Sequence, residues 1–115
     1  MADSIDLIIK AAADKKAADL IKIDVRDLTV VADYFVICSA KSTTQVKAIA
    51  DNIEEQLSKQ GISPLRIDGA REGRWIAMDY NEVIVHIFLD ELRLFYSIER
   101  LWANGDNITK YNNDK

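Results

Sequence analysis

Hydrophobic residues recur along this chain with two periods, which together predict the element order α-β-β-α-β-β-β-α. Apolar residues spaced three or four positions apart predict helices that begin at Asp3 or Ser4, at Ser42 and at Asp90. The second of these helices is expected to stop at Gly61. Alternating or continuous apolar runs predict five strands, at Ile21–Arg26, Tyr34–Cys38, Leu65–Asp68, Trp75–Tyr80 and Val83–Leu89.

Local signals indicate how these elements fit together. Ser42 and Gln45 have the spacing of a capping box, in which a serine caps the helix and a glutamine follows three residues on. The run Tyr34–Cys38 is apolar throughout, which predicts a central strand covered on both faces. The last two strands are expected to pair as a hairpin about Asn81-Glu82. That turn is weaker than Asn-Gly, because Glu82 tolerates a positive φ poorly.

These elements predict one α/β (α+β) domain, a single mixed five-stranded sheet flanked by helices, over residues 1–104. Residues 105–115 are polar and are expected to form a mobile tail. No apolar run approaches the roughly 20 residues that a membrane span needs, and the N-terminus does not resemble a secretory signal. The one cysteine, Cys38, lies within an apolar run and is expected to be a buried, inert thiol. We therefore expect a cytoplasmic protein.

The charge pattern bears on the kind of partner. The net charge is −4, and the 15 basic residues are scattered instead of forming a stripe. A chain that neutralises several phosphates normally shows such a stripe, so direct nucleic-acid binding is disfavoured. An acidic chain is better suited to a basic partner, because opposite charges speed their encounter.

Large aromatic side chains are concentrated near the C-terminus. The segment from Trp75 to Trp102 holds both tryptophans, the only histidine and six of the nine aromatic residues. Tryptophan, tyrosine and arginine dominate protein–protein hot spots, because each buries much area and keeps a polar group. The sequence therefore favours a binding protein.

Alternation along the strand at 75–80 separates two sets of side chains. Trp75 and Asp79 share one face, whereas Ile76, Met78 and Tyr80 share the other. Ile76 and Met78 are expected in the core, and Trp75 beside a carboxylate is expected to form one wall of a contact patch.

The last helix is expected to add a second stripe beside its buried one. This stripe consists of residues that repeat every three or four positions, namely Arg93, Tyr96, Glu99 and Trp102. His86 stands alone in an apolar strand, where a hydrogen-bonded structural residue, an interface residue and a catalytic or metal-binding residue all remain open. No metal or cofactor site is predicted, because no His or Cys lies near His86 in the sequence.

An enzymatic interpretation begins at the small-residue turn that precedes the helix at Ser42. Ser39 and Ser42 could place a phosphate at the N-terminus of that helix, with Asp68 holding a metal ion. Such enzymes need a second carboxylate on the same strand, where this chain has Arg66. They also have a glycine where this chain has Cys38. A small nucleotidyl- or phosphoryl-transfer enzyme is therefore the alternative hypothesis, and a homodimer that meets only itself is a third.

Two blocks of the sequence together resemble a known family, the ribosomal silencing factor (Iojap-like) proteins. The first block comprises the run Asp33–Ala40, followed by Gln45-Val46 and Ala48-Ile49-Ala50. The second comprises Gly69, Trp75-Ile76, Asp79-Tyr80, Val83–Phe88, Arg93, Phe95-Tyr96, Glu99 and Leu101-Trp102. One departure is Asn81, where the family commonly has glycine.

The resemblance implies a noncatalytic factor with a degenerate nucleotidyltransferase-like fold. Family members bind the large ribosomal subunit through its ribosomal protein fourteen, block subunit joining sterically and lower translation when nutrients are scarce. They are dimeric when free and bind the ribosome as one copy. By this resemblance, the partner-binding residues are expected to be Trp75, Asp79, Tyr80, His86, Arg93, Tyr96, Glu99 and Trp102.

Overall fold

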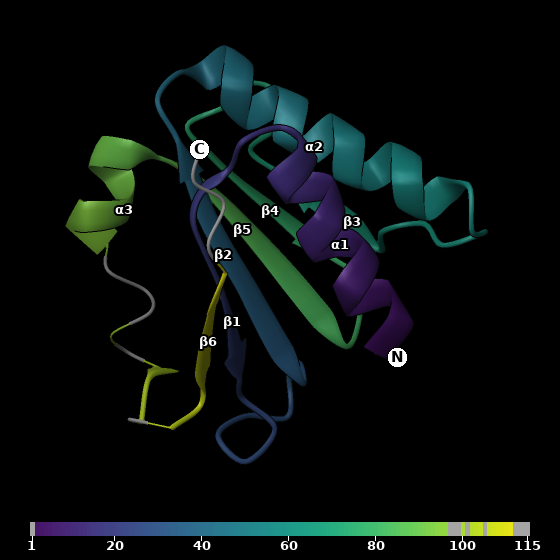
Figure 1. Cartoon of the computed structure of the whole chain (residues 1–115), viewed down its shortest axis with the longest axis vertical. Helices are drawn as coiled ribbons and strands as arrows, with labels where there is room; N and C mark the ends of the chain where they lie inside the picture. Colours follow the sequence, from purple (N-terminus) through teal and green to yellow (C-terminus); the bar gives the residue numbers. More distant parts are fainter. Residues whose placement is uncertain (1, 97–99, 101, 105, 112–115) are drawn as a thin grey trace.

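A mixed sheet, two long helices on one of its faces and a short third helix make up the fold (Figure 1). The computed structural model describes residues 2–96, 100, 102–104 and 106–111, with the backbone alone for residues 2, 3 and 94–96. The helices are α1 (Ala2–Asp14), α2 (Thr43–Ser58) and α3 (Asp90–Tyr96). The strands are β1 (Ala18–Asp24), β2 (Tyr34–Ala40), β3 (Arg66–Asp68), β4 (Trp75–Asp79), β5 (Val83–Leu89) and β6 (Ile108–Tyr111).

The strands lie in the order β3-β4-β5-β2-β1-β6. Only β2 and β5 pair in parallel, with Tyr34 opposite Val83 and Ala40 opposite Leu89, and the other neighbours are antiparallel. Helix α2 and strands β3 and β4 separate β2 from β5 in the sequence. The parallel pair nevertheless places them side by side at the centre of the sheet.

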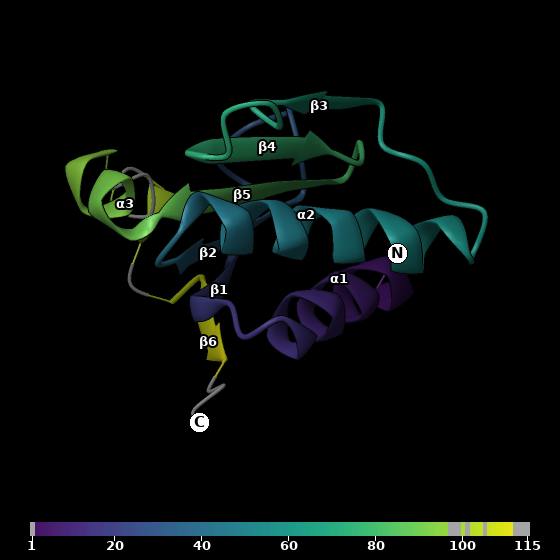
Figure 2. The same ribbon diagram turned by 90° about the horizontal axis from the view of Figure 1, so that it is seen from above.

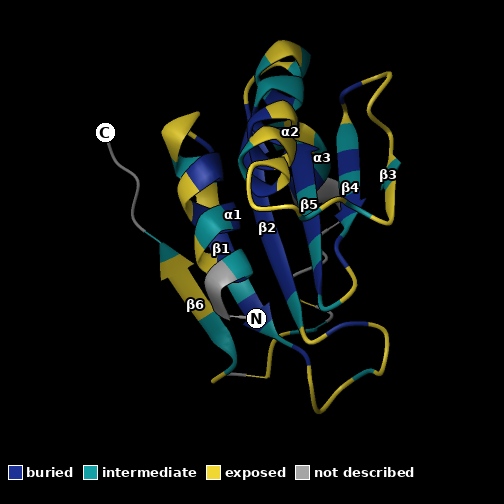
Figure 3. Ribbon diagram, turned by 90° about the vertical axis from the view of Figure 1, so that its right-hand side faces the viewer, coloured by how far each residue is buried: buried dark blue, intermediate teal, exposed yellow. Residues whose placement is uncertain are grey.

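Helices α1 and α2 cover one face of the sheet, as the view from above shows (Figure 2). Apolar residues of both helices meet those of the central strands in one buried cluster, including Ile8, Ile49, Val36, Met78 and Val85. The burial-coloured view shows the same central strands as the most buried part of the sheet (Figure 3). Burial of that apolar surface is the main force that holds the helices on the sheet.

The opposite face carries a second, smaller cluster. Ile21, Ile23, Phe35, Ile37 and Phe88 are buried there, and half-buried side chains of α3 and the C-terminal segment pack against them. Strand β2 contributes to both clusters, so the prediction of a central strand covered on both faces is confirmed.

Within the described residues, the sheet has six strands instead of the predicted five. The additional strand, β6, lies within the segment predicted to be a mobile polar tail and pairs antiparallel with β1. Asn107 anchors it: the backbone N–H of Asp24 donates to the carbonyl of Asn107 at 2.9 Å, and the Asn107 side chain donates to the carbonyls of Asp24 and Trp102. A short strand with exposed Thr109 and Lys110 gives little hydrophobic signal in the sequence.

The predicted helix cap is present in modified form. The Ser42 hydroxyl accepts the backbone N–H of Gln45 at 3.1 Å, as expected of an N-cap. The Gln45 side chain accepts the backbone N–H of Lys41 and donates to the carbonyls of Lys15 and Lys16. It therefore links the start of α2 to the end of α1.

The β4–β5 turn places its positive φ at Asn81, at 76°, and not at Glu82. Asparagine tolerates this region better than most residues other than glycine, so the turn forms without a glycine.

Gly69 and Gly61 provide a matched test of how the loop before β4 is packed. Both have a positive φ, but a Cβ at Gly69 would lie 2.0 Å from the carbonyl oxygen of Trp75, whereas a Cβ at Gly61 would meet nothing within 4 Å. We expect Gly61→Ala to cost about 1 kcal/mol of unfolding free energy from backbone strain. Gly69→Ala should cost about 2 kcal/mol more, because the β4 backbone must move. Urea unfolding measures both, and equal losses would contradict this packing.

Candidate functional site

The face of the sheet opposite α1 and α2, here called the open face, brings the predicted site residues of β4 and β5 together. In the sheet register Trp75 lies opposite Phe88, Ala77 opposite His86 and Asp79 opposite Ile84. The side chains of these six residues point to the same side, because alternate residues of a strand share a face. The expected division of β4 is confirmed, since Ile76 and Met78 are buried against the helices.

Five aromatic rings form a connected cluster on the open face. Trp75 stacks on Phe88 with ring centroids 4.9 Å apart, and His86 meets Phe35 edge-on at 5.6 Å. Trp102 meets the other side of Phe35 edge-on at 5.2 Å. Phe35 and Phe88 are buried, whereas Trp75, His86 and Trp102 are half-buried. The cluster therefore has a buried base and an accessible rim.

One hydrogen bond fixes the orientation of the accessible tryptophan. The indole N–H of Trp75 donates to Nδ1 of His86 at 3.1 Å. The imidazole must accept at Nδ1, so it is neutral and carries its proton on Nε2. Burial lowers the pKa of His86 to about 4, which agrees with a neutral ring. Of the three possibilities for His86, the structural hydrogen bond is present, and the half-buried ring also lies at the rim of the cluster.

Asp79 supplies a negative charge at the other end of β4. One of its carboxylate oxygens accepts the backbone N–H of Asn81 at 2.8 Å, which holds the side chain at the β4–β5 turn. Asp79 is half-buried, and Arg66 lies opposite it on β3. Arg66 is engaged with Asp68, whose carboxylate accepts its Nε–H at 3.1 Å.

Tyr80, predicted as a partner-binding residue, is placed by the structure within the core. Its side chain is 8% exposed and belongs to the cluster beneath α1 and α2. Its hydroxyl has no hydrogen-bond partner among the described residues. Burial, with a smaller contribution from the charge of Glu54, raises the pKa of Tyr80 to about 12. Most of this side chain is therefore covered by the fold.

Arg93 is also buried, at 8% exposure, and contacts backbone instead of solvent. One guanidinium nitrogen donates to the carbonyl of Asp19 at 2.6 Å, and to the carbonyl of Ala18 and the hydroxyl of Ser39 at 3.4 Å each. The β1 register shifts between Ala18 and Ile21, and Asp19 has a φ of 49°. Arg93 thus satisfies carbonyl groups at a β-bulge.

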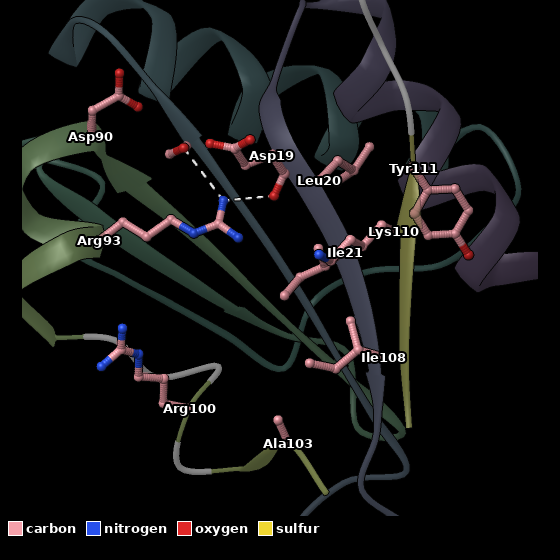
Figure 4. A pocket seen from close by; sticks show the side chains of 11 residues that line it. Asp19, Leu20, Ile21, Asp90, Arg93, Arg100, Ala103, Ile108, Lys110 and Tyr111 are labelled. Carbon is pink, nitrogen blue, oxygen red and sulfur yellow. Dashed lines mark hydrogen bonds between the residues drawn. The ribbon is translucent and has the colours of Figure 1, made fainter. Parts of the chain in front are cut away.

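Figure 4 shows the Arg93 guanidinium directed from α3 toward β1, into a cavity of about 690 Å³. Arg100 and Lys110 also line this cavity, together with the carboxylates Asp19 and Asp90. The mixture of charges does not define one ligand.

The remaining predicted residues are only partly described. Trp102 lies at the rim of the aromatic cluster, but Glu99 and the side chain of Tyr96 lie outside the described residues. The sequence analysis did not include Phe35 and Phe88 in the site. Phe35 is far from the segment Trp75–Trp102 in the chain, and only the parallel pairing of β2 with β5 brings it there.

The residues of the enzymatic alternative do not converge. Asp68 lies on the edge strand β3 and Ser39 on β2, three strand spacings or about 14 Å apart. Among the described residues, no group of three His, Cys, Asp or Glu side chains could hold a metal ion. Cys38 is buried, and desolvation raises the pKa of its thiol to about 12, so it is held as a thiol. Within the same residues, no helix is long and apolar enough to cross a membrane.

The open face, with its aromatic cluster and flanking carboxylate, has the composition of a protein-binding surface. Residues 1–115 match the family model described as "Ribosomal silencing factor during starvation", and the chain belongs to this family. It is 41% identical over 101 residues to the ribosomal silencing factor RsfS of Bacillus subtilis, which covers 86% of each chain. It is 33% identical over 104 residues to RsfS of Halalkalibacterium halodurans, covering 90% of this chain and 89% of the other.

A solved structure supports the same fold. The crystal structure of a Chromobacterium violaceum protein superposes with a TM-score of 0.87 at 29% identity, over 93% of this chain and 91% of that one. The mixed α/β architecture with one open sheet is therefore shared with an experimentally determined structure.

The Trp75–His86 hydrogen bond predicts a specific dependence of stability on pH. The folded pKa of His86 is about 4, below the ordinary 6.5, so folding favours the neutral ring. Between pH 6.5 and 4 the unfolded chain takes up a proton that the folded chain does not. The free energy of unfolding should therefore fall by about 2–3 kcal/mol over this range from His86 alone.

The control is His86→Asn, which retains an acceptor near Nδ1 but does not titrate. Chemical unfolding at a series of pH values should give a flatter profile for this variant than for the native chain. Parallel profiles would contradict a neutral His86.

Proposed function

We propose that this chain binds the large ribosomal subunit through ribosomal protein fourteen and sterically blocks its association with the small subunit. Family membership together with the half-buried aromatic cluster on the open face carries this proposal. The effect would be to repress translation when nutrients are limiting. No chemical step is required, because a bound globule of this size excludes a second large surface by its volume.

The open face has the features that a docking surface needs. Trp75 and His86 are accessible at their outer edges and held in place from below, so little side-chain entropy is lost on binding. A stable interface needs roughly 800 Å² per partner, with a few well-packed anchors near its centre. Trp75 is the central anchor in this proposal, His86 supports it and Trp102 extends the surface.

Charge complements these apolar contacts. Asp79 lies beside the cluster and the whole chain carries a net charge of −4. A basic ribosomal protein is attracted by this field, whereas phosphate-rich RNA is repelled. Glu99 and Tyr96, carried over from the family resemblance, remain part of the proposed surface. The buried Tyr80 and Arg93 support it from within.

We further propose that the free chain is a homodimer in the cytoplasm and binds the ribosome as one copy. A half-buried aromatic surface without a partner is a site at which two copies can associate. Sedimentation velocity of the free chain and the stoichiometry on large subunits test these two statements separately.

The central test is co-sedimentation with purified ribosomal subunits, followed by a joining assay. The native chain should pellet with large subunits and not with small ones, and should reduce the amount of joined ribosomes when added first. Free joining of the subunits at saturating chain would contradict the proposed mechanism. Metal-dependent nucleotide binding measured by calorimetry would instead favour the enzymatic alternative.

Trp75→Ala tests the central anchor. We expect its dissociation constant for large subunits to rise about thirtyfold, which corresponds to about 2 kcal/mol, because a hot-spot ring is lost. Thermal unfolding must show that the variant remains folded, since Trp75 also stacks on Phe88. Unchanged affinity of the folded variant would remove Trp75 from the interface.

Asp79→Asn tests the charge without disturbing the turn, because the amide oxygen can still accept the Asn81 N–H. Binding should weaken a few-fold and become less sensitive to salt, since a rim charge acts mainly on the association rate. The matched control is Asp51→Asn, an exposed carboxylate on α2. Equal effects of the two variants would point to overall charge instead of a contact at Asp79.

A further inference from the structure

The described residues include four large apolar side chains that are strongly exposed, and three of them lie in one loop. Leu28 is 45% exposed, Val30 103% and Val31 65% in the β1–β2 loop, and the fourth is Leu65 at 70%. Single exposed apolar residues are ordinary, but a contiguous group marks a surface that another molecule covers. The loop projects beyond the end of the sheet at the foot of β1 and β2 (Figure 1).

Backbone hydrogen bonds hold the loop at its base, whereas the apolar side chains at its tip are exposed. The backbone N–H of Val25 donates to the carbonyl of Asp33, and those of Leu28 and Thr29 donate to the carbonyl of Val25. Val25 itself is buried, as is Ala32 at the other end of the loop. Apolar side chains as exposed as Val30 and Val31 bury little area and add little to stability, so folding does not account for them.

Carboxylates surround the base of the tip. Asp27 and Asp33 are exposed, and Glu82 lies beside them, because its carbonyl accepts the backbone N–H of Asp33 at 2.8 Å. Two cations also lie there: Arg26 is paired with Asp24 at 2.6 Å, and Lys22 lies over the ring of Tyr34. The carboxylates still outnumber them. Such a border repels phosphate and anionic lipid, and a twofold contact with a second copy would bring like charges together. This border of carboxylates is complementary in charge to a basic protein surface.

The loop is continuous with the end of the open face where Asp79 lies. Because β2 and β5 are parallel, Tyr34 lies opposite Val83, and the β1–β2 loop and the β4–β5 turn emerge at the same end of the sheet. Backbone hydrogen bonds from Asp33 and Tyr34 to Glu82 join the two. One partner can therefore cover both the rim of the aromatic cluster and the loop.

We propose that Leu28, Val30 and Val31 form a second docking element, which inserts into an apolar depression on a basic protein partner. The inference rests on the proposed function, because that partner is the ribosomal protein bound by the open face. The aromatic cluster supplies the central anchor, and the loop tip fixes the rotation of the chain about that anchor. Two separated contacts determine an orientation that one contact leaves free.

The experiment measures the affinity of the full chain for purified large subunits. The double variant Val30→Ser with Val31→Ser should raise the dissociation constant at least tenfold. Its thermal unfolding should match that of the native chain, because both side chains are exposed. Leu65→Ser is the matched control: it removes a similarly exposed apolar side chain three strands from β2. Because the backbone N–H of Leu65 donates to the carbonyl of Asp79, this variant should bind within a few-fold of the native chain, as is expected for Asp79→Asn.

A second pair of variants identifies the chemistry of the partner. Val30→Lys should weaken binding more than Val30→Glu, because a lysine would face a basic surface. The reverse order would indicate an RNA contact and would overturn the assignment to a protein.

Other results distinguish the failure of this inference from the failure of the proposed function. Native affinity of the double variant, with Trp75→Ala still weakened, would overturn the loop contact alone. Equal losses of affinity in the double variant and in Leu65→Ser would also overturn the loop contact. A double variant that changed self-association but kept native affinity for large subunits would overturn it too. A native chain that does not bind large subunits would overturn both proposals.

Discussion

Strand β2 is apolar on both faces, and both faces must be covered. Val36 and Cys38 point toward α1 and α2, whereas Phe35 and Ile37 point to the other side. Two long helices cover the first face over its full width. Among the described residues, the second is covered by half-buried side chains such as Leu92 and Trp102, which pack against the cluster that contains Phe35 and Phe88. Within the described residues, the aromatic rim is therefore the part of the sheet that the two long helices leave accessible.

The internal hydrogen bond of Trp75 determines what a partner can use. The indole N–H is donated to His86, so the accessible part of the ring is its carbon edge. Contact there is apolar, so the binding free energy comes from the apolar area that is buried. The orientation of the partner must come from charges at the rim, such as that of Asp79. The low pKa of His86 also means that this arrangement is constant across the physiological pH range. The proposed docking face is therefore fixed and is not a pH switch.

Period-two and helical patterns were sufficient to predict the fold class, the core positions Ile76 and Met78, and the separation of Trp75 from the helix-covered side. Predictions from these patterns fail where a contact depends on backbone geometry. Arg93 reads as a surface residue of a helical stripe, but a bulge at Asp19 with a φ of 49° turns carbonyl groups toward it and draws it inward. Strand β6 was missed for a related reason, because its pairing depends on Asn107 and the edge of β1. Neither contact leaves a periodic signal.

The pairing of Arg26 with Asp24 also shapes the outer surface. With Arg26 paired with Asp24 and Lys22 held over the ring of Tyr34, the end of the sheet presents Asp79, Asp27, Asp33 and Glu82 without an equal number of unengaged basic groups among the described residues there. Apolar loop residues stand among these carboxylates. A surface that combines exposed valines with negative charge is poorly matched to RNA or lipid and well matched to a basic protein. The chemistry of the surface thus supports the proposed partner independently of family membership.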